Sequence, residues 1–202
     1  MKKGTLRKNQ YDKKNLMIIG MFLIGLLIGT ITANTLDQLE KMELSKYVSD
    51  TITNMNNVAI YYGDYLFESF TSQIKIVLII WVAGFFAYGF YVIYATVMIK
   101  GFLYGFTVAF LTGQFSLTGF FFGFLSYIPQ NLIYLPVIYI LAKVSIDNSL
   151  KATSGRKGQN FSKNVLFEYT VLLVVSLAFF GLGALVETYL TPGIVSSFIG
   201  RF

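Results

Sequence analysis

The chain contains neither cysteine nor histidine among its 202 residues. The absence of cysteine excludes disulfides, thiolate metal ligands and thiol nucleophiles. The absence of histidine removes the commonest general base and the commonest metal ligand. A rhomboid-type or metal-dependent intramembrane protease needs such residues, and an aspartyl type needs paired aspartates inside the membrane. We therefore expect no enzymatic activity, with no catalytic residue, metal site or cofactor.

Charged residues are also scarce, at 13% of the chain against 55% apolar residues. Between Lys100 and Lys143 the sequence has 42 residues without one charged side chain. A helix needs about 20 apolar residues to cross a bilayer, so this stretch must cross, turn and cross again. The sequence thus predicts an all-α, polytopic transmembrane helical bundle that forms a single domain over residues 1–202.

Apolar runs in the sequence predict about five membrane spans. Their expected limits are 16–33, 74–99, 101–115, 117–142 and 165–189. The first run also fits a signal peptide that ends near Ala33. We interpret it as a retained span, because its apolar core exceeds the usual 7–15 residues and Ile31 is poorly suited to a cleavage site.

Charges gather in three segments of alternating sign. Residues 1–15 hold six Lys or Arg and one Asp, residues 34–73 hold six Asp or Glu and two Lys, and residues 143–164 hold five Lys or Arg and one Asp. Basic residues collect on the cytoplasmic side of membrane proteins. We therefore expect the N-terminus inside, 34–73 as an external amphipathic loop, 143–164 as a cytoplasmic loop and the C-terminus outside. The net charge of +6 then indicates contact with membrane lipids and not with nucleic acid.

Small residues recur at fourfold spacing in two of the expected spans. They are Gly25 and Gly29 in the first span, and Gly101, Gly105, Ala109 and Gly113 in the third. Such spacing clears one face of a helix so that another backbone can approach closely. We interpret both faces as helix packing within the chain, with a homodimer as the alternative.

The acidic loop contains an apolar stripe followed by aromatic residues. The stripe has helical spacing and the aromatic residues are of the kind found at membrane surfaces. These residues are Leu44, Tyr47, Val48, Ile52 and Met55, then Tyr61, Tyr62, Tyr65 and Phe67. The stripe either lies on the bundle or membrane surface or forms a partner-binding surface.

Two prolines fall within the fourth expected span, with two amides beside the first. Pro129 removes one helical hydrogen bond, and Gln130 or Asn131 could bond the freed carbonyl groups. The alternative is a broken helix from Pro129 to Pro136 that lines a transport path. Two neutral amides are few for such a path, which favours the structural interpretation.

Three stretches together resemble the stage II sporulation protein M family. They are Lys100-Gly101-Phe102-Leu103-Tyr104-Gly105-Phe106-Thr107, the run Tyr127-Ile128-Pro129-Gln130-Asn131-Leu132-Ile133-Tyr134-Leu135-Pro136, and the last-span motif from Ala184 through Glu187 to Pro192. Relatives in the wider family often have His-Gly where this chain has Gln130-Asn131, and an acidic residue in place of Tyr134. These departures point to the sporulation branch.

The resemblance implies a non-enzymatic membrane scaffold. In that family the protein holds the peptidoglycan-degrading stage II sporulation proteins D and P at the septal membrane during engulfment. The expected partners are therefore these two proteins and membrane lipids, and the expected location is the bacterial cell membrane. The alternative function is a transporter or permease subunit.

Overall fold

The computed structural model describes residues 2–57, 62–153 and 163–198. Over these residues the chain forms helices and no strand. The five helices are α1 Lys2–Thr35, α2 Gln38–Asn57, α3 Tyr62–Ala83, α4 Gly89–Thr153 and α5 Lys163–Phe198. The expected all-α bundle is confirmed.

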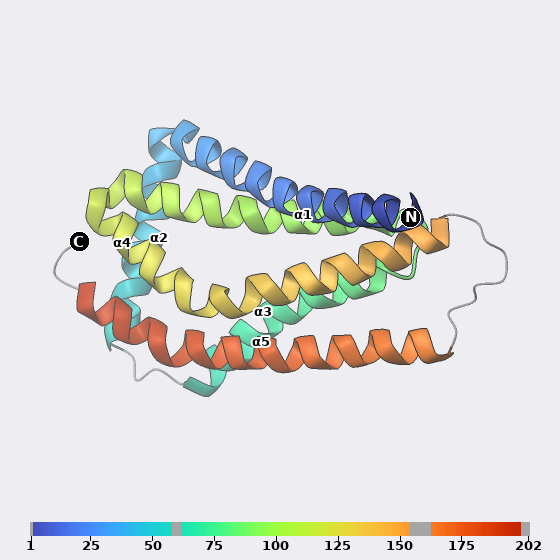
Figure 1. Cartoon of the computed structure of the whole chain (residues 1–202). Coiled ribbons are helices and arrows are strands. Elements are labelled where there is room, and N and C mark those ends of the chain that lie inside the picture. Colours follow the sequence, from blue (N-terminus) through green and yellow to red (C-terminus); the bar gives the residue numbers. More distant parts are fainter. Residues whose placement is uncertain (1, 58–61, 154–162, 199–202) are drawn as a thin grey trace.

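Four of these helices are long and apolar enough to cross a membrane: α1, α3, α4 and α5. Helix α4 folds back on itself at Phe115 and Ser116, where the backbone leaves helical geometry, and Ser116 has a φ of 54°. Its two arms therefore run in opposite directions, and the chain traverses the bundle five times (Figure 1). The start of α1 and the end of α5 lie at opposite ends of the bundle.

The two ends of the bundle carry different charges. Helix α2, which belongs to the acidic segment 34–73, lies across one end, named here the α2 end (Figure 1). The opposite end, named here the basic end, holds the start of α1, the α3–α4 turn, the end of α4 and the start of α5. Lys14 of α1 forms an ion pair there with Asp147 of α4. The other basic residues of this end include Lys13, Lys143, Lys151 and Lys163.

The helix expected over 74–99 is interrupted. Helix α3 ends at Ala83 and α4 begins at Gly89, so residues 84–88 form a turn at the basic end. Tyr88 adopts a left-handed backbone with a φ of 66°, which a continuous helix cannot contain. The position of this turn places Lys100 in the middle of the first arm of α4, and not at the end of a span.

The two loops expected in the sequence are largely helical. Helix α2 and the first part of α3 occupy most of the segment 34–73. At the other end, α4 continues to Thr153 and α5 starts at Lys163, so only 154–162 of the expected loop 143–164 lies outside the described residues.

Helices α1 and α4 approach each other so closely that four glycines lie in their contact. A Cβ atom at Gly25 or Gly29 would clash with the carbonyl oxygen of Met98 or Phe102, respectively. In the same way, Gly101 and Gly105 face the backbone of Phe22 and Leu26. Close backbone contact of this kind replaces the hydrophobic driving force that is lacking between helices in lipid.

The remaining two small residues of the fourfold pattern lie elsewhere. Ala109 packs with the apolar residues near the fold-back of α4. A Cβ atom at Gly113 would meet nothing within 4 Å, so this glycine takes no part in the contact with α1.

The main apolar core joins α3, both arms of α4 and α5, with Ile18 of α1 at its margin. Val77, Ile80, Ile93, Leu141 and Phe180 are among its most buried members. This core lies in the half of the bundle toward the basic end, next to the polar residues described below.

Candidate functional site

Helix α2 presents one face to the bundle and another to its surroundings. Leu44 and Val48, one helical turn apart, pack against a small cluster made by Ala33, Phe110, Leu111 and Phe122 near the fold-back of α4. Leu39, Met42 and Tyr47 point away from this cluster and have exposed fractions of 76%, 69% and 71%. These three residues are named here the α2 surface.

The structure separates the residues that the sequence had grouped into one stripe. Leu44 and Val48 are partly buried and pack against the bundle, whereas Tyr47 and Phe67 are exposed. Four other predicted residues lie in α2 or α3, but their side chains lie outside the described part of the chain: Ile52, Met55, Tyr62 and Tyr65. Tyr61 itself lies outside the described residues.

A second group of polar residues lies inside the bundle. Lys100, in the middle of the first arm of α4, has an exposed fraction of only 6%. Its Nζ donates a hydrogen bond of 2.8 Å to Oε1 of Gln73 on α3 and lies 5.9 Å from the centre of the Tyr104 ring. A buried lysine at membrane depth is costly and marks a functional-site candidate.

Glu187 on α5 provides the opposite charge. Its Oε2 accepts hydrogen bonds from Ser69 Oγ at 2.6 Å and from the Tyr134 hydroxyl at 3.3 Å. The charges of Lys100 and Glu187 act on each other. An ion pair requires a nitrogen and an oxygen of opposite charge within 4 Å, and Lys14 and Asp147 meet this condition. Among the described residues, Lys100 and Glu187 do not, so the two side chains are not in direct contact.

Asn131 and its neighbours join the two arms of α4. The Tyr104 hydroxyl on the first arm donates to Oδ1 of Asn131 on the second, and the rings of Tyr104 and Tyr127 meet edge to face at 6.0 Å. We name the whole group the polar cluster. It comprises Ser69, Gln73, Lys100, Tyr104, Tyr127, Gln130, Asn131, Tyr134, Glu187 and Thr188.

The helix is not broken at the two prolines. Pro129 and Pro136 lie inside the second arm of α4, whose backbone stays helical there, and the break lies at Phe115–Ser116 instead. Asn131 Nδ2 donates to the carbonyl oxygen of Tyr127 at 2.7 Å. That carbonyl is four residues before Asn131, so Asn131 does not bond the carbonyl of Leu125 that Pro129 leaves free.

Three buried side-chain oxygens of α4 and α5 have no hydrogen-bond partner among the described residues. They belong to Ser126, Gln130 and Thr188, with exposed fractions of 7%, 4% and 0%. Gln130 precedes Tyr134 by one helical turn, and Thr188 follows Glu187. A buried polar atom without a partner costs about 1–3 kcal/mol unless water or a ligand bonds it.

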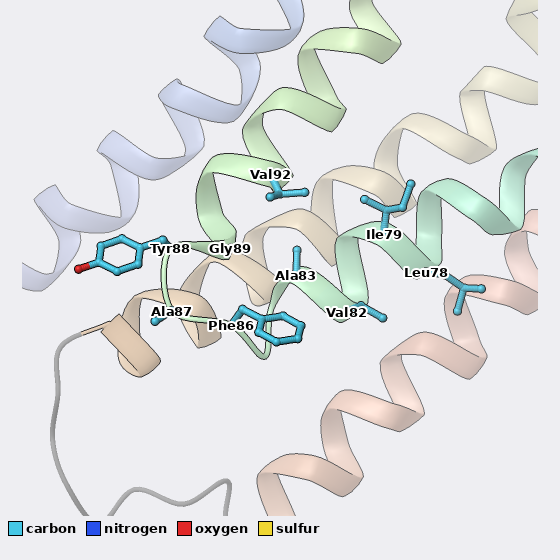
Figure 2. Close-up of a pocket in the computed structure, with 9 residues that line it drawn as sticks. All are labelled: Leu78, Ile79, Val82, Ala83, Phe86, Ala87, Tyr88, Gly89 and Val92. Atoms are coloured by element: carbon cyan, nitrogen blue, oxygen red, sulfur yellow. The ribbon is translucent and has the colours of Figure 1, made fainter.

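An apolar crevice opens beside the turn at the basic end. Its volume is about 490 Å³, and its walls are formed by Ile79 and Val82 of α3, Phe86 of the turn and Val92 of α4 (Figure 2). The two helices diverge from the turn, which leaves this space between them. Its carbon-rich walls match the hydrocarbon of a bilayer and offer no group for chemistry.

Comparison with known proteins adds one finding. The family model of stage II sporulation protein M matches residues 18–192, a range that includes both the α2 surface and the polar cluster. No curated protein and no solved structure matches the chain.

Proposed function

The chain belongs to the stage II sporulation protein M family, and from this premise we propose that it is a non-enzymatic scaffold of the sporulating cell. The family and the long apolar helices make it a multi-pass membrane protein of sporulation. In the proposed function it recruits the peptidoglycan-degrading stage II sporulation proteins D and P to the septal membrane during engulfment.

The main structural support for this proposal is the exposure of the apolar side chains of the α2 surface. Large exposed apolar side chains in contact with water mark a protein interaction site when they lie together. Leu39, Met42 and Tyr47 lie on a helix that is already anchored to the bundle through Leu44 and Val48. Residues on a helix that is already formed and packed against the bundle lose less conformational entropy on binding than an unfolded segment would.

The charges at the two ends of the bundle support a particular side of the membrane for partner binding. Basic residues favour the cytoplasmic side, which would place the α2 end toward the cell wall. Enzymes that degrade peptidoglycan act on that side. The acidic residues around the α2 surface, such as Glu40 and Glu43, would then favour a partner segment that carries basic residues.

The proposal of a scaffold without catalytic activity rests on the sequence. The chain has no cysteine or histidine. In the polar cluster Lys100 is bonded to Gln73, and Glu187 is bonded to Ser69 and Tyr134. The alternative of a transporter with a helix broken at Pro129–Pro136 loses its basis because α4 is continuous there.

Copurification of the partners from sporulating cells tests the proposed function. The variant Leu39→Ser/Met42→Ser/Tyr47→Ser should capture at least about tenfold less of proteins D and P, because central apolar residues dominate binding energy. Phe86→Ser is the matched control, because Phe86 is equally exposed but lies at the basic end. Undiminished capture by the triple variant would exclude the α2 surface as the binding site.

A further inference from the structure

We propose that the lipid-facing side of α3 and of the first arm of α4 binds a transmembrane helix of a partner protein. That helix carries a carboxylate at the depth of Lys75 and a bulky apolar side chain that enters the crevice beside the turn. The inference concerns a surface within the membrane and goes beyond the α2 surface, which lies at one end of the bundle. It rests on the exposure and depth of Lys75, on the spacing of its neighbours and on the position of the crevice.

Lys75 is a charged residue on the outside of a membrane span. It is exposed and lies near the middle of the apolar segment Leu66–Ala83 of α3, nine residues from one end and eight from the other. Gln73, two residues earlier, bonds Lys100 in the middle of the first arm of α4, which indicates the same depth. Among the described residues, none forms a hydrogen bond or an ion pair with Lys75.

Contact with lipid headgroups does not account for this lysine. Lysines close to the end of a span can extend their side chains to the membrane surface. The ends of the apolar segment are each about 12–14 Å from Lys75 along the helix, however, and the four-carbon stem of a lysine is shorter than that. A charge at this depth is costly and marks a functional site. A carboxylate supplied by another molecule would compensate it.

The exposed residues around Lys75 have the spacing of a helix-packing seam. They recur along α3 at alternating intervals of four and three residues, which is the pattern by which one helix packs along another. Across the crevice, Val92 on the first arm of α4 forms the opposite wall (Figure 2). We name the exposed stripe of α3 the α3 seam, and it comprises Glu68, Ser72, Lys75, Ile79 and Val82.

The order of the charge and the crevice distinguishes a helix from a lipid. Ile79 and Val82 of the α3 seam line the crevice, so it lies four to seven residues beyond Lys75 toward the basic end. This separation is about 6–10 Å, and the apolar space is nearer the membrane surface than the charge. A phospholipid of that leaflet has the opposite order, with its headgroup at the surface and its acyl chains deeper. A helix can present a carboxylate and an apolar side chain in either order.

The charges of the α3 seam disfavour a second copy of this chain as its partner. All copies cross the membrane in the same direction, so a two-fold dimer has its axis along the membrane normal. Pairing through the α3 seam would then bring each Lys75 and each Glu68 against its own equivalent. Such contacts between like charges select against self-association. The α3 seam therefore suits a different helix, which has an acidic residue where this chain has a lysine.

A designed transmembrane helix tests this inference with the full-length chain. The probe is a leucine-rich single span with one Glu at the depth of Lys75 and one Phe about five residues nearer its cytoplasmic end. A second probe has Gln in place of that Glu, and a third has Lys. Each probe is coexpressed with the chain, and the amount that copurifies in mild detergent is measured. We expect about tenfold more of the Glu probe than of the Gln probe, because the ion pair forms away from water.

Exchange of the two charges tests the role of Lys75 directly. Lys75→Glu should lose the Glu probe and bind the Lys probe instead, and this rescue would show that the variant is folded. Lys46→Glu is the matched control, because Lys46 is an exposed lysine of α2 that lies away from the α3 seam. It should leave the preference for the Glu probe unchanged.

Filling the crevice tests its part in binding. Val82→Phe/Val92→Phe adds bulk to both walls and should reduce capture of the Glu probe about tenfold, because it closes the space for the apolar side chain of the probe. Val171→Phe/Val174→Phe is the matched control, because these two valines are also exposed but lie on α5 outside the crevice. Its capture of the probe should be unchanged.

Equal capture of the Glu and Gln probes, or undiminished capture of the Glu probe by Lys75→Glu, would overturn the proposal. Two other occupants would be recognised by their own signals. An anionic lipid is identified if brominated phosphatidylglycerol quenches Trp81, the single tryptophan, more than brominated phosphatidylcholine does and Lys75→Gln removes the difference. A second copy is identified if the chain self-associates and Lys75→Gln abolishes the association. Either of these results would also overturn the proposal.

Discussion

At the scale of single residues, the bundle contains two charged side chains that neutral groups hold: the buried Lys100 and the half-buried Glu187. Each is held by neutral side chains from another segment: Lys100 by Gln73, and Glu187 by Ser69 and Tyr134. These bonds connect α3, both arms of α4 and α5. The cost of burying the two charges is thus offset only when all four segments are in place, which ties the charges to one arrangement of the helices.

Removing the charge of Lys100 or Glu187 alone should therefore destabilise the protein more, per residue changed, than removing both charges. We expect Glu187→Leu or Lys100→Met alone to lower the stability of the purified protein by about 1–3 kcal/mol, since each leaves the other charge and the polar side chains bonded to the lost group without a partner. The double variant should lose clearly less than the sum of the two. Thermal unfolding in detergent measures this coupling. Glu168→Leu, at an exposed position of the same helix as Glu187, should change stability by less than about 0.5 kcal/mol.

The glycines between α1 and α4 make a second prediction at this scale. Gly101→Ala places a methyl group against the carbonyl of Phe22 and should destabilise the chain by about 1–3 kcal/mol, because the facing atoms belong to backbone that cannot turn aside. Gly113→Ala introduces the same group in the same arm with nothing within 4 Å. It should be neutral or slightly stabilising in thermal unfolding. Equal losses in both variants would contradict the close contact.

At the scale of secondary-structure elements, the turn 84–88 is held by side chains from the far end of α4. Ser149 Oγ donates to the carbonyl oxygen of Phe86 at 2.9 Å and accepts from the backbone N–H of Phe90 at 2.8 Å. Thr153, one turn later, accepts from the N–H of Tyr88 at 3.1 Å. One stripe of α4 thus satisfies the backbone groups that the turn exposes.

Loss of the Ser149 hydroxyl should loosen this turn. Ser149→Ala leaves a carbonyl and an N–H without partners and should cost about 1–3 kcal/mol. Amide hydrogen exchange should rise locally at residues 84–90. Thr170→Val is a suitable control, because the Thr170 hydroxyl is exposed and bonds only the carbonyl of Leu166 in its own helix. Unchanged exchange in Ser149→Ala would show that the turn does not depend on this contact.

The turn at residues 84–88 is a part of the fold that the sequence did not predict. Apolar length predicted the helical class, and glycine spacing predicted close packing of the first span and of the residues after Lys100. Residues 84–88 are apolar and aromatic, so they carry no polar signal, and their hydrogen-bond partner Ser149 is distant in the sequence. Gly84, the first residue of the turn, and Gly89, the residue after it, were the available sign. Without that turn, Lys100 was placed at the end of a span, and its contact with Gln73 could not be foreseen.

The apolar stripe of α2 could be resolved only in part from the sequence, for a related reason. Its spacing correctly indicated a helix, but spacing cannot tell which apolar residues find a partner within the same chain. Leu44 and Val48 meet Phe110 and Leu111, which come more than sixty residues later. Only the folded chain shows that Tyr47 remains exposed while its neighbour Val48 does not.

At the scale of the whole molecule, an odd number of traverses separates the two ends of the chain. The start of α1 lies at the basic end and the end of α5 lies at the α2 end (Figure 1). With basic residues favouring the cytoplasm, a reporter that is active only in the cytoplasm should work when fused before Met1 and fail when fused after Phe202. Activity at both positions would mean an even number of crossings, which contradicts the five traverses.

The contact between α1 and α4 also bears on how the protein is made. Gly25 and Gly29 lie against the segment of α4 that contains Gly101 and Gly105, which leave the ribosome 76 residues later. At about 5–20 residues per second, the first helix waits roughly 4–15 s in the membrane before its companion is synthesised. During that interval its groove of small side chains is covered by lipid or by the insertion machinery. Biogenesis of this bundle therefore includes a stage in which α1 is complete while the helix that packs against it has not yet been made.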